Sequence, residues 1–193
     1  MQSSQYPVQK EKSQRLARFS QYMAVATLVL MVLILLINVI YWLWPDFAYS
    51  WFGFSFSISI AKMIGVEIID LLLWQRFGGI VVSSLPLLTL VLAALSLFKL
   101  FRLYARKEYF SEQAALYLER VGKFVMLWVI LNFLCQPATS YWMTMNAPIG
   151  HRMITLGLGS EDIIALFLSA CFYIIARILG QASTVYIENQ SFV

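Results

Sequence analysis

The sequence predicts an all-α integral membrane protein, a bundle of four transmembrane helices with a small outer cap of strand and helix between the first and second. Two observations predict this class. Hydrophobic residues make up 61% of the 193 residues and charged residues only 12%, against about 45–50% and about 25% in soluble domains. The apolar residues also fall into four runs that approach the roughly 20 residues a helix needs to cross a bilayer. A soluble fold could not bury so much apolar surface.

The four apolar runs set the boundaries of the predicted transmembrane helices. We expect these helices over residues 23–44, 80–101, 121–143 and 163–179. Each run should be helical, because backbone N–H and C=O groups in hydrocarbon must find their partners within the segment. No polar stretch between the runs is long enough to fold alone. Residues 1–193 are therefore predicted to form a single membrane domain.

Residues at the ends of the runs support these boundaries. Ser111 and Ser160 are expected to begin helices, because a serine side chain can accept hydrogen bonds from free N–H groups at a helix N-terminus. Glu161 and Asp162 favour the positive end of the helix dipole. Bulky aromatic residues stand near the run ends, as expected of residues that prefer the membrane interface: Tyr41, Trp42, Trp44, Tyr141 and Trp142.

Two prolines fall inside the predicted spans. Pro86 lies in the second run and Pro137 in the third. Because proline lacks a backbone N–H and its ring clashes with the preceding turn, each is expected to bend its helix.

The lysines and arginines predict the orientation. Basic residues in loops and near span ends favour the cytoplasmic side. Three lie in the connections after the first and third runs: Lys62, Arg76 and Arg152. Eleven lie before the first run, around the 102–120 loop and at the end of the fourth: Lys10, Lys12, Arg15, Arg18, Lys99, Arg102, Arg106, Lys107, Arg120, Lys123 and Arg177. Both termini and the 102–120 loop are therefore predicted to be cytoplasmic.

The outer loop over residues 45–79 is the largest feature on the other side. Residues 52–60 alternate large apolar with small side chains, which predicts a short strand. Residues 61–77 set a few charged side chains among aliphatic ones, which favours a helix that lies along the interface or caps the bundle. A re-entrant loop is the alternative.

Three amide side chains interrupt the apolar runs and form a candidate intramembrane polar site: Asn38, Asn132 and Gln136. They could line a small polar site near the centre of the bundle, opened by a bend at Pro137. The alternative is a structural role in hydrogen bonds between helices, worth about 0.6–2 kcal/mol each.

The predicted cytoplasmic face carries the strongest surface signal. Its candidate lipid-binding or partner-binding residues are Arg15, Arg18, Arg102, Arg106, Lys107, Arg120, Lys123 and Arg177. Each basic residue near a membrane surface contributes about 1 kcal/mol of attraction to anionic lipid. The same face could dock a cytoplasmic protein, with residues 188–193 as a further contact. Arg177 could extend to the interface, or it could pair with Glu108, Glu112 or Glu119.

The composition argues against most membrane chemistry. A membrane haem usually needs paired histidines, and the chain has only His151. Cys135 and Cys171 stand far apart and form no CxxC motif, so neither thiol exchange nor a zinc site is indicated. No Asp or Glu lies within the four runs, which argues against intramembrane proteolysis and ion-coupled transport. We therefore expect no cofactor and no enzymatic activity.

The chain resembles a bacterial four-span family known as domain of unknown function 2975 in residues 103–111 and in Leu118, Arg120, Val121 and Gly122. The ending over 176–179 and 187–193 resembles it too, so the resemblance is clearest over 97–193. Lys107 stands where the family commonly has glycine, which leaves the geometry of that turn open. The resemblance implies a bacterial inner-membrane protein with no assigned chemistry and no catalytic residues to transfer. Some members look like partners of small helix-turn-helix regulators, which would suggest signalling.

These observations predict a multipass inner-membrane protein that acts as a non-enzymatic regulatory, sensory or interaction module. Its partners would be membrane lipids and a cytoplasmic or envelope protein, without direct binding of nucleic acid. The alternative is a small-molecule permease or channel. Four helices leave little room for a polar pathway, so that alternative would require a homo-oligomer.

Overall fold

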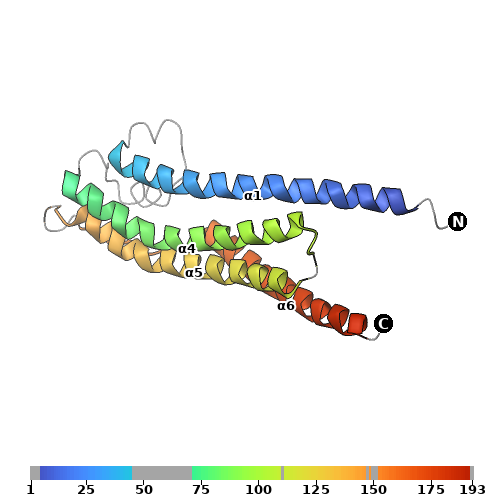
Figure 1. Cartoon of the computed structure of the whole chain (residues 1–193). Coiled ribbons are helices and arrows are strands. Elements are labelled where there is room, and N and C mark those ends of the chain that lie inside the picture. Colours follow the sequence, from blue (N-terminus) through green and yellow to red (C-terminus); the bar gives the residue numbers. More distant parts are fainter. Residues whose placement is uncertain (1–4, 45–70, 110, 147, 149–151, 192–193) are drawn as a thin grey trace. The chain divides into compact units, whose positions relative to one another are not determined.

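The computed structural model describes the chain as four long helices (Figure 1). The described residues are 5–44, 71–109, 111–146, 148 and 152–191. The helices are α1 (Gln5–Leu43), α4 (Leu73–Ala105), α5 (Glu112–Thr144) and α6 (Ser160–Ser191). Within the described ranges there is no strand. The predicted all-α class with four helices is confirmed.

Each helix contains a segment that is long and apolar enough to cross a membrane: Gln14–Leu43, Leu73–Ala105, Glu112–Thr144 and Ser160–Val185. All four helices extend beyond the apolar runs from which they were predicted. Pro86 and Pro137 both lie inside continuous helices. These four segments are the pattern of a multipass membrane protein.

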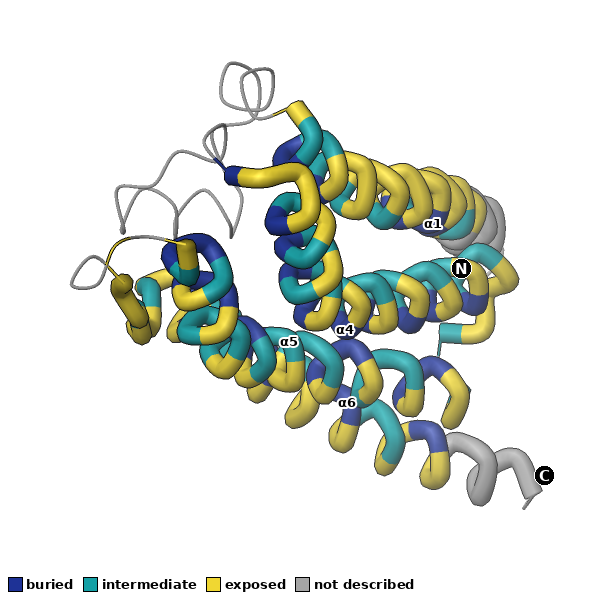
Figure 2. Tube along the Cα trace, turned by 90° about the vertical axis from the view of Figure 1, so that its left-hand side faces the viewer, coloured by how far each residue is buried: buried dark blue, intermediate teal, exposed yellow. Residues whose placement is uncertain are grey.

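The exposed sides of the helices also suit a lipid environment. Figure 2 shows that buried and exposed residues follow different sides of each helix. Large apolar side chains occupy much of the exposed side, including Phe167 (68% exposed) and Ile178 (61%) on α6. Water would not favour so many exposed apolar groups, whereas lipid tails are as apolar as leucine.

The outer-cap prediction falls mostly outside the described residues. The strand predicted over 52–60 lies there entirely, and so does most of the helix predicted over 61–77. The predicted C-terminal boundary of the 61–77 helix is wrong, because residues 73–77 belong to α4. Gln75 and Arg76 do not break this helix, because both are good helix formers. Their polar groups bond to Trp142, Leu71 and neighbouring backbone.

The chain divides into two compact units, and segments of all four helices contribute to both. Unit 1 comprises Met1–Met31, Val91–Val125 and Phe167–Val193. Unit 2 comprises Val32–Leu90 and Met126–Leu166. The prediction of a single membrane domain is not tested by this division and stays a prediction.

Unit 1 has its core where the end of α4 meets the start of α5. Leu100, Leu103 and Ala114 form the buried centre. The partly buried residues packed against it are Leu97, Tyr104, Tyr117, Leu118 and Leu179. The α5 helix begins as predicted, because the Ser111 hydroxyl accepts a hydrogen bond from Ala114 N at 3.2 Å. This cap satisfies one of the free N–H groups at the N-terminus.

Small residues allow α5 and α6 to approach closely in unit 1. Gly122 faces the backbone of α6, and a Cβ added there would lie 2.8 Å from the Ser169 carbonyl oxygen. Elsewhere along the same two helices, Ala115 on α5 lies against Gly180 on α6. Small residues at such positions are the usual means by which membrane helices gain close van der Waals contact.

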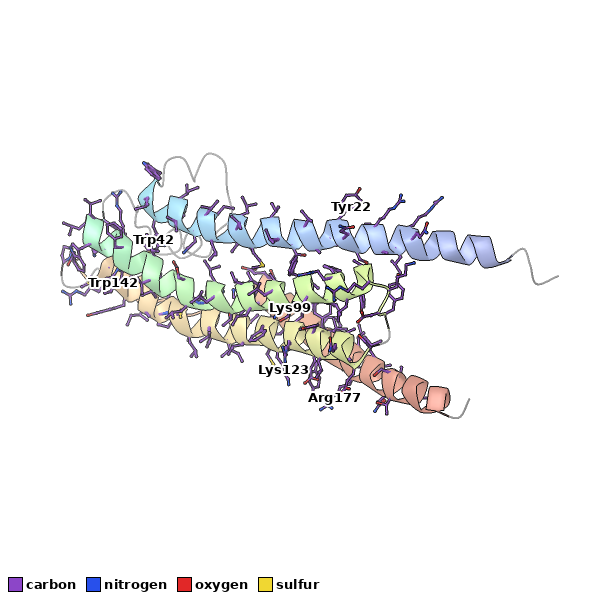
Figure 3. All side chains as sticks on the ribbon, viewed as in Figure 1. Tyr22, Trp42, Lys99, Lys123, Trp142 and Arg177 are labelled. Carbon is purple, nitrogen blue, oxygen red and sulfur yellow. The ribbon has the colours of Figure 1, made fainter. Side chains whose placement is uncertain are left out.

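Unit 2 is organised around the first turns of α4. Gly78 lies against the Trp142 indole from α5, and Gly79 lies against the Trp42 indole from α1. Figure 3 labels both tryptophans. A side chain at either glycine would collide with the ring it faces. The Trp142 indole also donates a hydrogen bond to Gln75 O at 2.9 Å.

These contacts correct the prediction that all the aromatic residues near the run ends serve as interface anchors. Trp42 is fully buried, whereas Trp44, two residues later, is 64% exposed. The burial of Trp42 is explained by its position over Gly79 and by a hydrogen bond from its Nε1 to Ser83 Oγ at 3.1 Å. A tryptophan can fill space between helices when its N–H finds a partner.

The start of α6 differs in detail from the prediction. The expected capping residue Ser160 is already helical. Gly159 precedes the helix, and its carbonyl accepts the N–H groups of Asp162 and Ile163. The Asp162 carboxylate accepts a hydrogen bond from Gly159 N at 3.0 Å. The third residue of the helix therefore binds the backbone N–H of the residue just before the helix, as in a capping box.

Candidate functional site

Asn38, the first of the three predicted polar residues, belongs to a hydrogen-bonded network between α1 and α4 in unit 2. Its Nδ2 donates to Ser84 Oγ at 3.3 Å, and its Oδ1 accepts from Ser83 Oγ at 3.0 Å. Ser83 Oγ in turn accepts the hydrogen bond from Trp42. Asn38, Trp42 and Ser83 are all buried. Both ends of the Asn38 amide therefore have partners within the protein.

Gln136 belongs to a different arrangement, a row of polar side chains on α5. Gln136, Ser140 and Thr144 are spaced four residues apart, so they lie along one side of the helix. Residues 152–159 run beside this row without regular secondary structure. Backbone N–H groups from this segment donate to the row: Met153 to Thr144 Oγ1 at 3.3 Å, Thr155 to Ser140 Oγ at 3.0 Å and Gly157 to Gln136 Oε1 at 2.9 Å.

The spacing of the two segments explains why three bonds form in succession. Four helical residues rise about 6 Å, and two extended residues advance about 6.6 Å. Alternate N–H groups of the 152–159 segment thus meet successive residues of the row. The two spacings differ slightly, and the difference adds up along the row. It is largest at Gln136, which has the longest side chain of the three. We call this arrangement the α5 row, meaning Gln136, Ser140 and Thr144 together with the 152–159 segment.

Asn132 is buried on α5 but takes part in neither the Asn38 network nor the α5 row. The three predicted residues are thus placed in separate surroundings, and among the described residues no hydrogen bond joins them. A shared polar site of Asn38, Asn132 and Gln136 stays a prediction. Ser83 and Ser84 were not predicted to bind Asn38, because nothing in the sequence around them marks them as its partners. The signal that could have found the α5 row is the spacing of Gln136, Ser140 and Thr144, which are four residues apart in the sequence.

The basic residues predicted to form a lipid or partner face all lie in unit 1, and all of their side chains are exposed. They come from α1, the end of α4 and its turn, the start of α5, and α6: Arg15, Arg18, Arg102, Arg106, Lys107, Arg120, Lys123 and Arg177. We call these eight residues the basic face.

Aromatic rings and one acid hold several of these cations. The Arg177 guanidinium donates to the Tyr173 hydroxyl at 3.1 and 3.3 Å and lies over the same ring. Arg102 lies over Phe98, with 5.7 Å between Cζ and the ring centroid. Glu119 pairs with Lys123 one turn along α5. Figure 3 labels Lys99, Lys123 and Arg177 on their three helices.

The contacts of Arg177 are within its own helix, and the choice between extension to the interface and pairing with an acid stays open. Its hydrogen bonds go to Tyr173 on its own helix. Glu119 also attracts it electrostatically, although the ion pair of Glu119 is with Lys123. An exposed guanidinium over an aromatic ring is typical of a side chain that reaches a polar interface.

The described residues contain no group of three or more His, Cys, Asp or Glu side chains that could hold a metal ion. Cys135 and Cys171 are both free and half-buried. His151 lies outside the described residues.

Four long apolar helices, with exposed apolar sides and one basic face, indicate a multipass α-helical membrane protein. The chain matches the family described as "Protein of unknown function (DUF2975)" over residues 21–193. It belongs to that family, as the residues around the 103–111 turn and the C-terminus predicted. The match also covers most of the first helix, where the resemblance was not evident from motifs. Comparison with curated proteins and with solved structures gave no match.

Proposed function

We propose that this protein is a non-enzymatic interaction module of the bacterial inner membrane, with a regulatory or sensory role. The observation that carries the proposal is the basic face, eight exposed cationic side chains that all belong to unit 1. The partner would be a cytoplasmic protein with an acidic surface, because opposite charges speed association and fix the orientation of partners.

The proposed orientation places both termini and the turn between α4 and α5 in the cytoplasm. Basic residues are far more numerous at these ends than in the other two connections. Because positively charged loops stay on the cytoplasmic side, the basic face would meet cytoplasmic proteins and the inner leaflet together.

The surroundings of the polar side chains favour this proposal over a permease. Asn38 and Gln136 both bond to groups of this chain. A transport pathway needs polar groups that can exchange such bonds for a solute or water. Bonds already made to Ser83, Ser84 and Gly157 serve the packing of unit 2.

The experiment that tests the proposal is crosslinking in intact cells followed by purification of the tagged protein from membranes. The matched variants are R106Q/K107Q, which removes two charges from the basic face, and R152Q, which removes an exposed charge on the other side. We expect a reproducible cytoplasmic partner with the parent and with R152Q. Capture should fall at least about fivefold with R106Q/K107Q, since two screened charge contacts contribute about 1 kcal/mol or more together.

Two outcomes would contradict the proposal. One is recovery of the parent protein without any reproducible partner. The other is solute flux in proteoliposomes that disappears when Asn38, Asn132 and Gln136 are replaced by alanine, which would establish the permease instead.

A further inference from the structure

Two cationic side chains from different helices share one aromatic ring in unit 1. Lys99 Nζ on α4 lies 5.8 Å from the centroid of the Tyr117 ring, and Arg120 Cζ on α5 lies 5.7 Å from the same centroid. Each distance is within the range of a cation–π contact. Lys99 and Arg120 are exposed, and Tyr117 is half-buried between them and the core of unit 1.

Among the described residues, no acidic side chain pairs with Lys99 or Arg120. The acid beside Arg120 in sequence, Glu119, is paired with Lys123 and also attracts Arg177. Two like charges that share one ring repel each other, and an anion that binds both would stabilise both.

The position along the helices identifies the kind of anion. Lys99 lies near the end of the apolar part of α4, and Tyr117 and Arg120 lie just before the apolar part of α5. This is the level at which hydrocarbon gives way to lipid headgroups, and where tyrosine, lysine and arginine prefer to lie. The anionic groups at that level are lipid phosphates.

Exposed apolar residues next to the cations favour a whole lipid over free phosphate. Leu95 and Leu92 lie four and seven residues before Lys99, so they follow the same side of α4 toward the apolar part of the helix. Both are exposed. A phosphate held at Lys99 would thus have an acyl chain running over leucines, which inorganic phosphate cannot use.

We propose that Lys99, Tyr117 and Arg120 form a binding site for the phosphate of an anionic phospholipid such as phosphatidylglycerol. Lys99 and Arg120 bind the phosphate oxygens, and the Tyr117 ring holds the two cations in place. The site depends on the chain lying in a membrane, but it does not depend on a protein partner.

The test uses the full-length protein purified in neutral detergent. Its melting temperature and its lipid adducts in native mass spectrometry are measured with added phosphatidylglycerol, phosphatidylcholine or inorganic phosphate. We expect phosphatidylglycerol alone to raise the melting temperature of the parent. The variant K99Q/R120Q should bind phosphatidylglycerol at least about tenfold more weakly, because each charge contact contributes about 1 kcal/mol.

Matched variants separate a site from general charge. R106Q/K107Q removes the same number of charges from the same end of the helices but leaves the Tyr117 cluster intact, so it should weaken phosphatidylglycerol binding less than K99Q/R120Q does. Y117F keeps the ring and should also bind like the parent, whereas Y117L should bind more weakly. The single variants K99Q and R120Q give the same comparison if the double variant does not fold.

Three results would overturn the site. Equal weakening in R106Q/K107Q would mean that only total charge matters. An equal effect of phosphatidylcholine would remove the need for an anion, and an equal effect of inorganic phosphate would remove the need for a lipid. Capture of a protein partner is a separate measurement, so failure of this site and failure of the proposed function are distinguishable.

Discussion

At the scale of single residues, the end of α4 shows how a local backbone conformation is set. Lys107 has a φ of 68°, the left-handed region that L-residues other than glycine seldom adopt. Glu108 N donates to Leu103 O at 3.2 Å, and Lys107 N donates to Tyr104 O at 3.0 Å. This pair of bonds is the Schellman motif, in which a left-handed residue ends the helix. The turn therefore has the geometry that glycine adopts most readily.

This geometry predicts that Lys107→Gly stabilises the protein. Relief of the left-handed conformation gains about 1–2 kcal/mol, and the greater freedom of glycine in the unfolded chain offsets about 0.5–1 kcal/mol. We expect a net gain of about 0.5–1 kcal/mol in the free energy of unfolding, measured by SDS titration in mixed micelles and followed by circular dichroism.

Lys107→Ala is the control for this prediction, because it removes the charge and keeps the unfavourable conformation. It should give no comparable gain. If alanine stabilised the protein as much as glycine, charge repulsion within the basic face would be the cause, and the conformational explanation would be wrong.

At the scale of elements, the sequence predicted which segments are helical but not how far they extend. Hydrophobicity alone locates a span, since about 20 apolar residues suffice to cross a bilayer. It does not mark where a helix ends, because lysine, arginine, glutamate and glutamine are good helix formers. The α1 helix therefore begins at Gln5 and α4 at Leu73, well before their apolar runs.

Contacts between elements were harder to predict than the elements themselves. The bonds of Asn38 to Ser83 and Ser84 join residues more than 40 positions apart. They form only because Trp42 and Gly79 bring α1 and α4 together, and no local pattern encodes that approach. The residues of the basic face could be predicted without knowledge of such contacts, because they flank the apolar runs in the sequence.

The α5 row explains how the 152–159 segment remains ordered without regular secondary structure. Its N–H groups would otherwise lack partners wherever water is scarce, and each unsatisfied group there is costly. Ser140 and Gln136 provide acceptors for Thr155 and Gly157. Polar residues of α5 thus replace the hydrogen bonds that a helix would supply within itself.

We predict that Ser140→Ala and Gln136→Leu each accelerate amide hydrogen exchange in residues 153–157. Each substitution removes one acceptor, and a hydrogen bond worth about 0.5–1.5 kcal/mol corresponds to about two- to tenfold faster exchange. Mass spectrometry of peptides that cover this segment measures the change. Asn132→Leu, one turn away on the same helix, is the control and should leave exchange in 153–157 unaltered.

A result in which Asn132→Leu accelerated exchange as much as Gln136→Leu would count against the α5 row. General loosening of α5, instead of loss of a particular acceptor, would then explain the effect. Unchanged exchange in both Ser140→Ala and Gln136→Leu would mean that the row does not hold the segment.

At the scale of the whole molecule, the distribution of charge is the property that links architecture to the proposed function. Lysines and arginines that favour one orientation in the membrane also form the basic face. The same residues would therefore set the topology during insertion and then present a positive surface to anionic lipid and acidic partners. Both roles require that the basic face lies on the cytoplasmic side of the membrane.

We predict that Arg152 is reached from outside the cell and Arg106 from the cytoplasm. Both side chains are exposed, so R152C and R106C can be compared directly in a chain whose native cysteines have been changed by Cys135→Ala and Cys171→Ala. A membrane-impermeant maleimide should label R152C in intact cells. It should label R106C only after the membrane is permeabilised, since the basic residues around this position hold it on the cytoplasmic side. Labelling of R106C in intact cells, with R152C protected, would reverse the topology and turn the basic face away from cytoplasmic partners.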